Sequence, residues 1–65
     1  MYIIIEIQTN EESCSVLHEV QQERNQAESV YHDKLHYAAV SNVRIHSVTM
    51  LNDAGERLKG EVYYH

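Results

Sequence analysis

Two histidines four residues apart, His32 and His36, have the spacing of a helical metal site. On a helix, side chains at positions i and i+4 lie on one side, where two imidazoles can share a zinc ion, and Glu28 could add a third ligand. Helical zinc motifs place a glutamate directly after the first histidine, but Asp33 stands there. His36 also falls opposite the expected apolar stripe and His32 at its border. A solvated or interface helix face therefore explains the pair better, and we predict no metal and no cofactor.

The other side chains that could act as bases or nucleophiles are scattered. His18, His46 and His65 fall in separate segments, so the sequence neither shows nor excludes a site that collects several of them. His46 stands beside apolar neighbours in an expected strand, which favours a hydrogen-bonded core or interface histidine over a metal ligand. Cys14 follows two glutamates, whose negative charge disfavours the thiolate that a cysteine nucleophile needs.

Motifs for catalysis or phosphate binding are missing from the chain. There is no glycine-rich loop, and no Ser, His and Asp set has a recognisable order. The five tyrosines favour packing at the rim of a core or interface over base stacking, because the basic surface that accompanies a stacking platform is absent. We therefore predict that the protein is not an enzyme, and we identify no small-molecule substrate.

The charge balance restricts the partners further. Ten acids against five bases give a formal net charge of −5, which makes nucleic acid an improbable ligand. Residues 1–33 hold seven acids and one base, whereas residues 34–65 hold three acids and four bases. Association of copies could pair these unlike halves, although a generally acidic surface is the simpler interpretation. A single cysteine and an apolar start that Glu6 interrupts favour a cytoplasmic protein without a membrane segment.

The first half of the chain predicts a hairpin followed by a helix. Residues 2–9 alternate and are rich in isoleucine, which is typical of a strand, and residues 16–21 alternate as a returning strand after the polar turn at 10–13. Asn25 followed by Glu28 matches a capping box, so we expect the helix to begin at Asn25. We expect it to end near Ser41, with Asn42 in a left-handed conformation. The apolar positions of this helix are Ala27, Val30, Tyr31, Leu35, Ala38 and Ala39.

The second half predicts another hairpin. Residues 43–51 and 58–64 read as strands, and residues 52–55 as a type I turn with Gly55 in the left-handed position. The fold class is therefore α+β in the order β-β-α-β-β: a four-stranded antiparallel sheet with one amphipathic helix on one face. Residues 1–65 form a single domain.

One helix cannot cover both faces of a four-stranded sheet, so the uncovered face needs another partner. We expect Ile3, Ile5 and Ile7 to face the helix. The other alternation then turns Tyr2 and Ile4 away, and Tyr63 with them. A chain of 65 residues is also short of buried area. We therefore predict a homo-oligomer, and the interface candidates are Tyr2, Ile4 and Tyr63.

Three segments carry a resemblance to a known family: residues 6–9, 24–32 and 38–41, followed by Val43, His46 and Gly55. Over nearly its whole length the chain resembles short uncharacterised proteins encoded in phages and mobile elements of gut-dwelling Gram-positive bacteria. The resemblance implies a phage-related context and a minor structural or assembly role, with no catalytic residues to carry over. Other members have a glycine in the first turn, where this chain has residues 12–14, Glu-Ser-Cys.

Together these features favour a non-enzymatic interaction or structural module of phage or mobile-element origin that self-associates through its sheet. A phage or host protein is a further possible partner. Two alternatives stay open. One is a small metal-binding or histidine-switched protein, and the other is an acidic decoy that occupies a nucleic-acid-binding protein.

Overall fold

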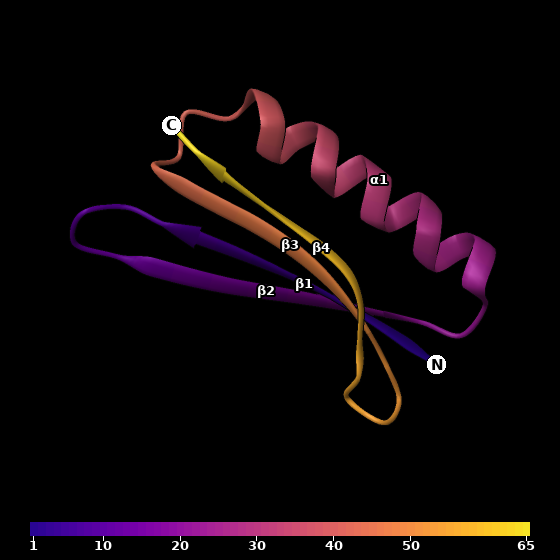
Figure 1. Ribbon diagram of the computed structural model, residues 1–65. Coiled ribbons are helices and arrows are strands. Elements are labelled where there is room, and N and C mark those ends of the chain that lie inside the picture. The colour runs from indigo at the N-terminus through magenta and orange to yellow at the C-terminus, as the bar shows by residue number, and fades with distance from the viewer.

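The computed structural model describes residues 1–65 and contains four strands and one helix (Figure 1). The elements are β1 (Tyr2–Thr9), β2 (Cys14–Gln21), α1 (Arg24–Val40), β3 (Ile45–Asn52) and β4 (Arg57–Tyr64). The strands form one antiparallel sheet in the order β2-β1-β3-β4, and α1 lies on one face. The predicted α+β class and element order are confirmed. Helix α1 lacks the length and the apolar composition to cross a membrane.

The turn between β3 and β4 has the predicted geometry. Gly55 has a φ of 79°, the left-handed conformation that glycine adopts without steric cost. Its N–H donates to the Asn52 carbonyl at 3.0 Å, and the Asn52 side-chain oxygen accepts from the N–H groups of Ala54 and Glu56. The turn residues are therefore hydrogen-bonded to one another, which fixes the register of the second hairpin.

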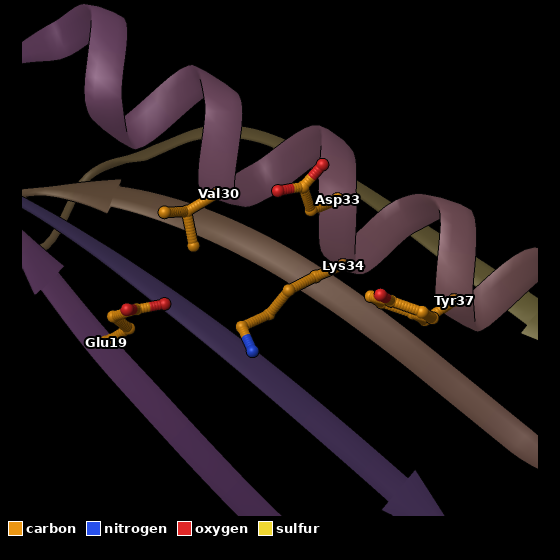
Figure 2. Close-up of a pocket in the computed structure, with 5 residues that line it drawn as sticks. All are labelled: Glu19, Val30, Asp33, Lys34 and Tyr37. Carbon is orange, nitrogen blue, oxygen red and sulfur yellow. The ribbon is translucent and has the colours of Figure 1, made fainter.

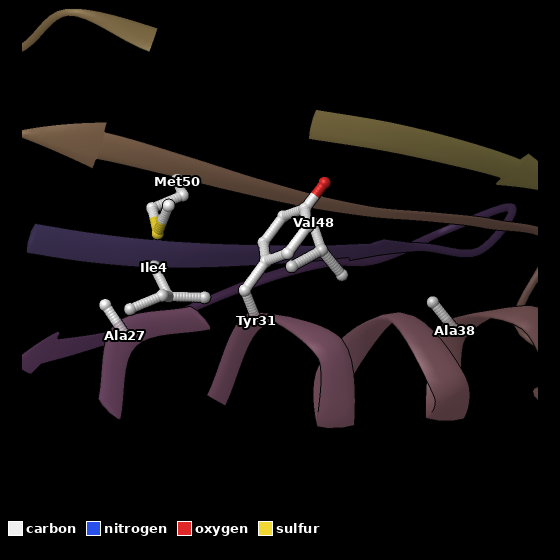
Figure 3. Close-up of a cluster of buried hydrophobic side chains, with 6 residues drawn as sticks. All are labelled: Ile4, Ala27, Tyr31, Ala38, Val48 and Met50. Carbon is white, nitrogen blue, oxygen red and sulfur yellow. The ribbon is translucent and has the colours of Figure 1, made fainter. Parts of the chain in front are cut away.

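The core lies between α1 and the two central strands, β1 and β3 (Figure 3). Three large side chains from the sheet, Ile4, Val48 and Met50, are fully buried there. Ala27 and Ala38 present small side chains that let the helix approach the sheet closely, and Tyr31 fills the space between them. This core is small, since its six residues include two alanines.

The predicted orientation of the sheet is wrong. Ile4 is 0% exposed beneath the helix, while Ile3, Ile5 and Ile7 point to the opposite face. Tyr2 and Tyr63 also pack against the core from the helix side. The three interface candidates therefore lie under α1 and not on the uncovered face.

The helix face of the sheet carries charged residues that find partners on α1. Lys59 Nζ donates to Glu28 Oε2 at 2.7 Å, and Lys34 Nζ lies 3.7 Å from Glu6 Oε1. These cross-element pairs explain why the more polar alternation faces the helix, since its charges would otherwise lose their partners.

The helix begins earlier than predicted. Its N-cap is Glu23, which makes no side-chain capping bond, so Asn25 is an exposed residue of the first turn and not the cap. Glu28 does not reach back to Asn25 because it is bound to Lys59. At the other end Ser41 is extended, with a φ of −75°, and Asn42 is not left-handed, because Gly55 alone has a positive φ.

We expect Asn25→Ala to stabilise the protein slightly, because alanine is the better helix former by roughly 0.5 kcal/mol at an interior helical position. Glu23→Ser should stabilise it by about 1 kcal/mol, because serine can accept a bond from an N–H of the first turn. Thermal unfolding of both variants checks this. A lower midpoint for Asn25→Ala would restore Asn25 as the cap.

Candidate functional site

The face of the sheet opposite α1, here called the back face, carries the apolar alternation of the strands and is not covered by the helix. The strand register determines its members, because directly opposed residues of antiparallel strands point to the same side. Its apolar residues are Ile3, Ile5, Ile7, Val16, Val20, Ile45, Leu51, Val62 and Tyr64. Several of them, including Val16, Val62 and Tyr64, are exposed.

The back face carries no acidic residue, although the chain has ten. Its polar residues include Thr49 and His18. One full charge lies on it: the Arg57 guanidinium lies over Gly60, 2.8 Å from where a Cβ would stand, and donates to the Gly60 carbonyl. The face is therefore apolar in its chemistry and free of the negative charge found elsewhere.

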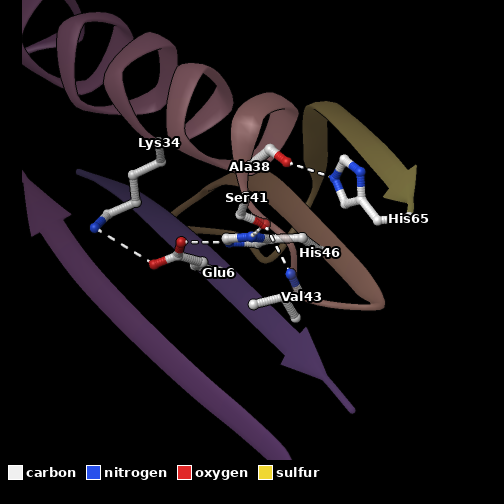
Figure 4. Close-up of polar contacts among 7 residues, drawn as sticks. All are labelled: Glu6, Lys34, Ala38, Ser41, Val43, His46 and His65. Atoms are coloured by element: carbon white, nitrogen blue, oxygen red, sulfur yellow. Dashed lines mark hydrogen bonds and ion pairs between the residues drawn. The ribbon is translucent and has the colours of Figure 1, made fainter.

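A buried polar cluster connects β1, β3 and the end of α1 (Figure 4). His46 is 3% exposed, and its Nε2 lies 2.5 Å from Glu6 Oε2. Its Nδ1 lies 2.9 Å from the Ser41 Oγ, which in turn accepts the Val43 N–H at 3.3 Å. The prediction of a hydrogen-bonded core histidine at position 46 is confirmed.

Both ring nitrogens of His46 have a polar partner. Nε2–H donates to the Glu6 carboxylate, and Nδ1 is hydrogen-bonded to the Ser41 hydroxyl. Every buried side-chain polar atom thereby has a partner, as it has throughout the protein. The order carboxylate, imidazole and hydroxyl is also that of hydrolase triads. The sequence order concealed this group because its members come from three elements.

A second polar group holds α1 to the edge strand β4. Lys59 binds Glu28 and lies 5.6 Å from the centre of the Tyr31 ring. The hydrogen bond from Lys59 holds the pKa of Glu28 below its usual value, and burial raises the pKa of the Tyr31 hydroxyl. The helix is thus fastened on the β4 side.

An open groove lies between α1 and β2 (Figure 2). The groove has a volume of about 280 Å³ and is lined by Glu19 of β2 and by Val30, Asp33, Lys34 and Tyr37 of α1. Seven of the eight β2 residues are exposed, and Gln21 is half-buried. Strand β2 is therefore the least covered element of the sheet.

The histidines and the cysteine are not gathered into one site. His32 and His36 are exposed on α1, with His32 Nε2 3.6 Å from Glu28 Oε2. His65 bonds the Ala38 carbonyl at 2.9 Å, and Cys14 is exposed at the start of β2. No three metal-binding side chains come together.

Sequence reasoning identified an uncovered apolar face but selected the wrong alternation. One signal favoured the correct one: the strand at residues 57–64 places Lys59 and Glu61 in the same alternation as Tyr63, and Val62 and Tyr64 in the other. A helix whose charges complement these residues can pack on the face of the sheet that carries them. The sequence alone did not show which helix charges would reach the sheet.

Comparison with family models, curated proteins and solved structures finds no match for this chain.

We expect Glu6 and His46 to be strongly coupled in stability. His46→Leu should cost about 3 kcal/mol, because it leaves the buried Glu6 carboxylate with Lys34 as its sole charged partner. Glu6→Leu with His46→Leu should cost much less than the two single changes combined, because no buried charge is then orphaned. Urea unfolding of the four proteins measures the coupling, and Ser41→Ala, with an expected cost of about 1 kcal/mol, is the milder control. If the double variant lost as much stability as the two single variants together, the predicted coupling of Glu6 and His46 would be contradicted.

The Glu28–Lys59 pair predicts loss of stability in acid. Because the folded-state pKa of Glu28 is lowered, its contribution is present above the usual value of 4.5 and is lost as the pH falls through the lower folded value. Lys59→Met removes the charged partner and should flatten this part of the stability profile. Thermal midpoints between about pH 6 and pH 3 test this. Parallel profiles for the two proteins would contradict it.

Proposed function

We propose that this chain is a non-enzymatic interaction or structural module of phage or mobile-element origin that self-associates by packing the back faces of two copies together. The observation that carries the proposal is that the more apolar face of the sheet is the one α1 leaves uncovered. The sequence resemblance described above supports the phage-related context.

The size of the core supports a need for further burial. Six apolar residues are buried in each copy, and two of them are alanines. A domain this small is marginal in stability unless disulfides, metals or association supplement its core. The single cysteine excludes an internal disulfide. Covering the back face would shield nine more apolar side chains in each copy.

The charge of the back face supports a second copy as the occupant. Each copy has a formal net charge of −5, but its acids lie on the helix, in the turns and on the helix face of the sheet. Two back faces can therefore meet without opposing acids. Sheets pack in this way about 10 Å apart, with interdigitating aliphatic side chains.

The polar cluster supports a structural role over a catalytic one. Ser41 lies at the C-terminal end of α1, where the helix dipole is negative and disfavours the oxyanion of an acyl-transfer reaction. The groove described above is lined by none of the three cluster residues. The cluster thus fastens the helix end to β1 and β3.

The two other candidate functions have less support. A metal-binding or histidine-switched protein would be favoured by histidines that lie together, but His32 and His36 are exposed on α1 and His46 is bound to Glu6. An acidic decoy would be favoured by a continuous acidic surface, whereas Glu6 and Glu28 are both paired with lysines.

Two neighbouring isoleucines should respond differently to lysine. Ile5→Lys places a charge near the centre of the back face and should convert the assembly into folded monomers, because Ile5 lies outside the core. Ile4→Lys buries that charge under α1 and should unfold the protein, since Ile4 is 0% exposed. Sedimentation at about 100 μM and circular dichroism measure the two outcomes, and thermal stability should depend on concentration in the wild type and not in Ile5→Lys.

Val40→Lys is the matched control, because Val40 is 69% exposed on the helix and lies outside the back face. This variant should sediment as the wild type does. A wild-type monomer of 7.6 kDa under these conditions would overturn the proposal.

A further inference from the structure

The two edges of the sheet differ in how they are protected. Strand β4 carries Arg57 and Lys59, and its register with β3 shifts between Met50 and Leu51. Edge lysines, arginines and irregular register are the features by which natural sheets prevent further strand pairing. The contact between Lys59 and Glu28 also holds the helix close to this edge.

Strand β2 has no basic residue and no irregular register, and its one charged side chain is Glu19, on the helix face of the sheet. It contains no lysine, arginine or proline, and it pairs with β1 through eight consecutive residues without a bulge. Seven of its eight residues are exposed, and an open groove lies between it and α1 (Figure 2). A regular, exposed strand of this kind presents a row of unpaired backbone groups to another strand.

We propose that β2 pairs antiparallel with β2 of a second copy, so that two four-stranded sheets join into one eight-stranded sheet. This inference rests on the proposed packing of back faces, which it extends from a dimer to a tetramer of two joined sheets. A two-fold axis perpendicular to the sheet relates the joined copies, so both helices lie on one side and both back faces on the other.

The difference between the edges also explains why such an assembly would stop growing. The free backbone groups of the two β2 strands pair with each other across the two-fold axis. The outer edges of the joined sheet are then the protected β4 strands. An isologous contact of this kind closes, whereas a β2-to-β4 contact would generate an open fibre. The assembly is therefore closed at four copies.

The available area favours the joined sheet. Four strands of eight residues give a face of about 19 by 26 Å, or about 500 Å², from the usual strand spacing and rise. Two single faces together would bury about 1,000 Å², which is the lower limit of stable interfaces. Joined sheets would bury about 2,000 Å², which is the upper end of the standard size of stable interfaces. Strand pairing alone buries little area, so it forms only together with face packing.

Lysines at the β2 edge test the pairing. Ser15→Lys with Leu17→Lys places charges beside the expected axis, but on the helix face of the sheet, where they leave the back face unchanged. Leu17 is 49% exposed, so a folded single copy tolerates the change. Ala39→Lys with Val40→Lys adds the same charge to exposed positions of α1 and is the matched control.

Sedimentation equilibrium at about 100 μM should give about 30 kDa for the wild type and the control, four times the chain mass of 7.6 kDa, and about 15 kDa for the edge variant. Ile5→Lys should give the single-copy mass. A wild-type dimer that the edge variant leaves unchanged would overturn strand pairing while the face packing stands. A tetramer that the edge variant leaves intact would also overturn strand pairing, and a wild-type monomer would overturn both proposals.

Discussion

Helix α1 packs on the face of the sheet whose charged residues it can pair. Glu28 binds Lys59 and Lys34 lies beside Glu6, so the helix supplies partners for the polar alternation of the strands. If α1 lay on the other face, these groups would lose their partners and the contact would be almost wholly apolar. With the observed choice every buried polar side-chain atom has a partner, and the apolar alternation lies on the face that α1 does not cover. The small core, the half-buried isoleucines of the back face and the proposed association all follow from this choice.

The buried cluster around His46 makes the helix position specific. An apolar contact between a helix and a sheet is non-directional and tolerates sliding, whereas hydrogen bonds to both imidazole nitrogens require one arrangement. Ser41 ends the helix and Glu6 lies on a central strand, so the cluster sets where the helix finishes relative to the sheet. His65 is hydrogen-bonded to the Ala38 carbonyl, so the last residue of the chain also lies at this end of the helix.

Association and edge protection are two consequences of the same small sheet. A four-stranded sheet with one helix has one open face and two edges, and each of these can bind another copy of the chain. The basic residues and the irregular register of β4 protect one edge from further strand pairing. The proposed packing of copies accounts for the open face and for β2, without requiring any residue beyond those in the chain.

The sequence by itself determined the features that depend on local interactions. The alternation of Tyr2–Thr9, the turn at Gly55 and the single helix were all predictable, because strand pattern, left-handed glycine and helical period act over a few residues. The hydrogen-bonded state of His46 also followed from its apolar neighbours. Only the tertiary structure showed that Glu23 and not Asn25 precedes the helix and that Glu28, the expected capping-box partner, binds Lys59 across the fold. It also decided that Ile4 and not Ile5 is buried, because the choice of face depends on which helix charges reach which strands, a contact between residues far apart in the chain.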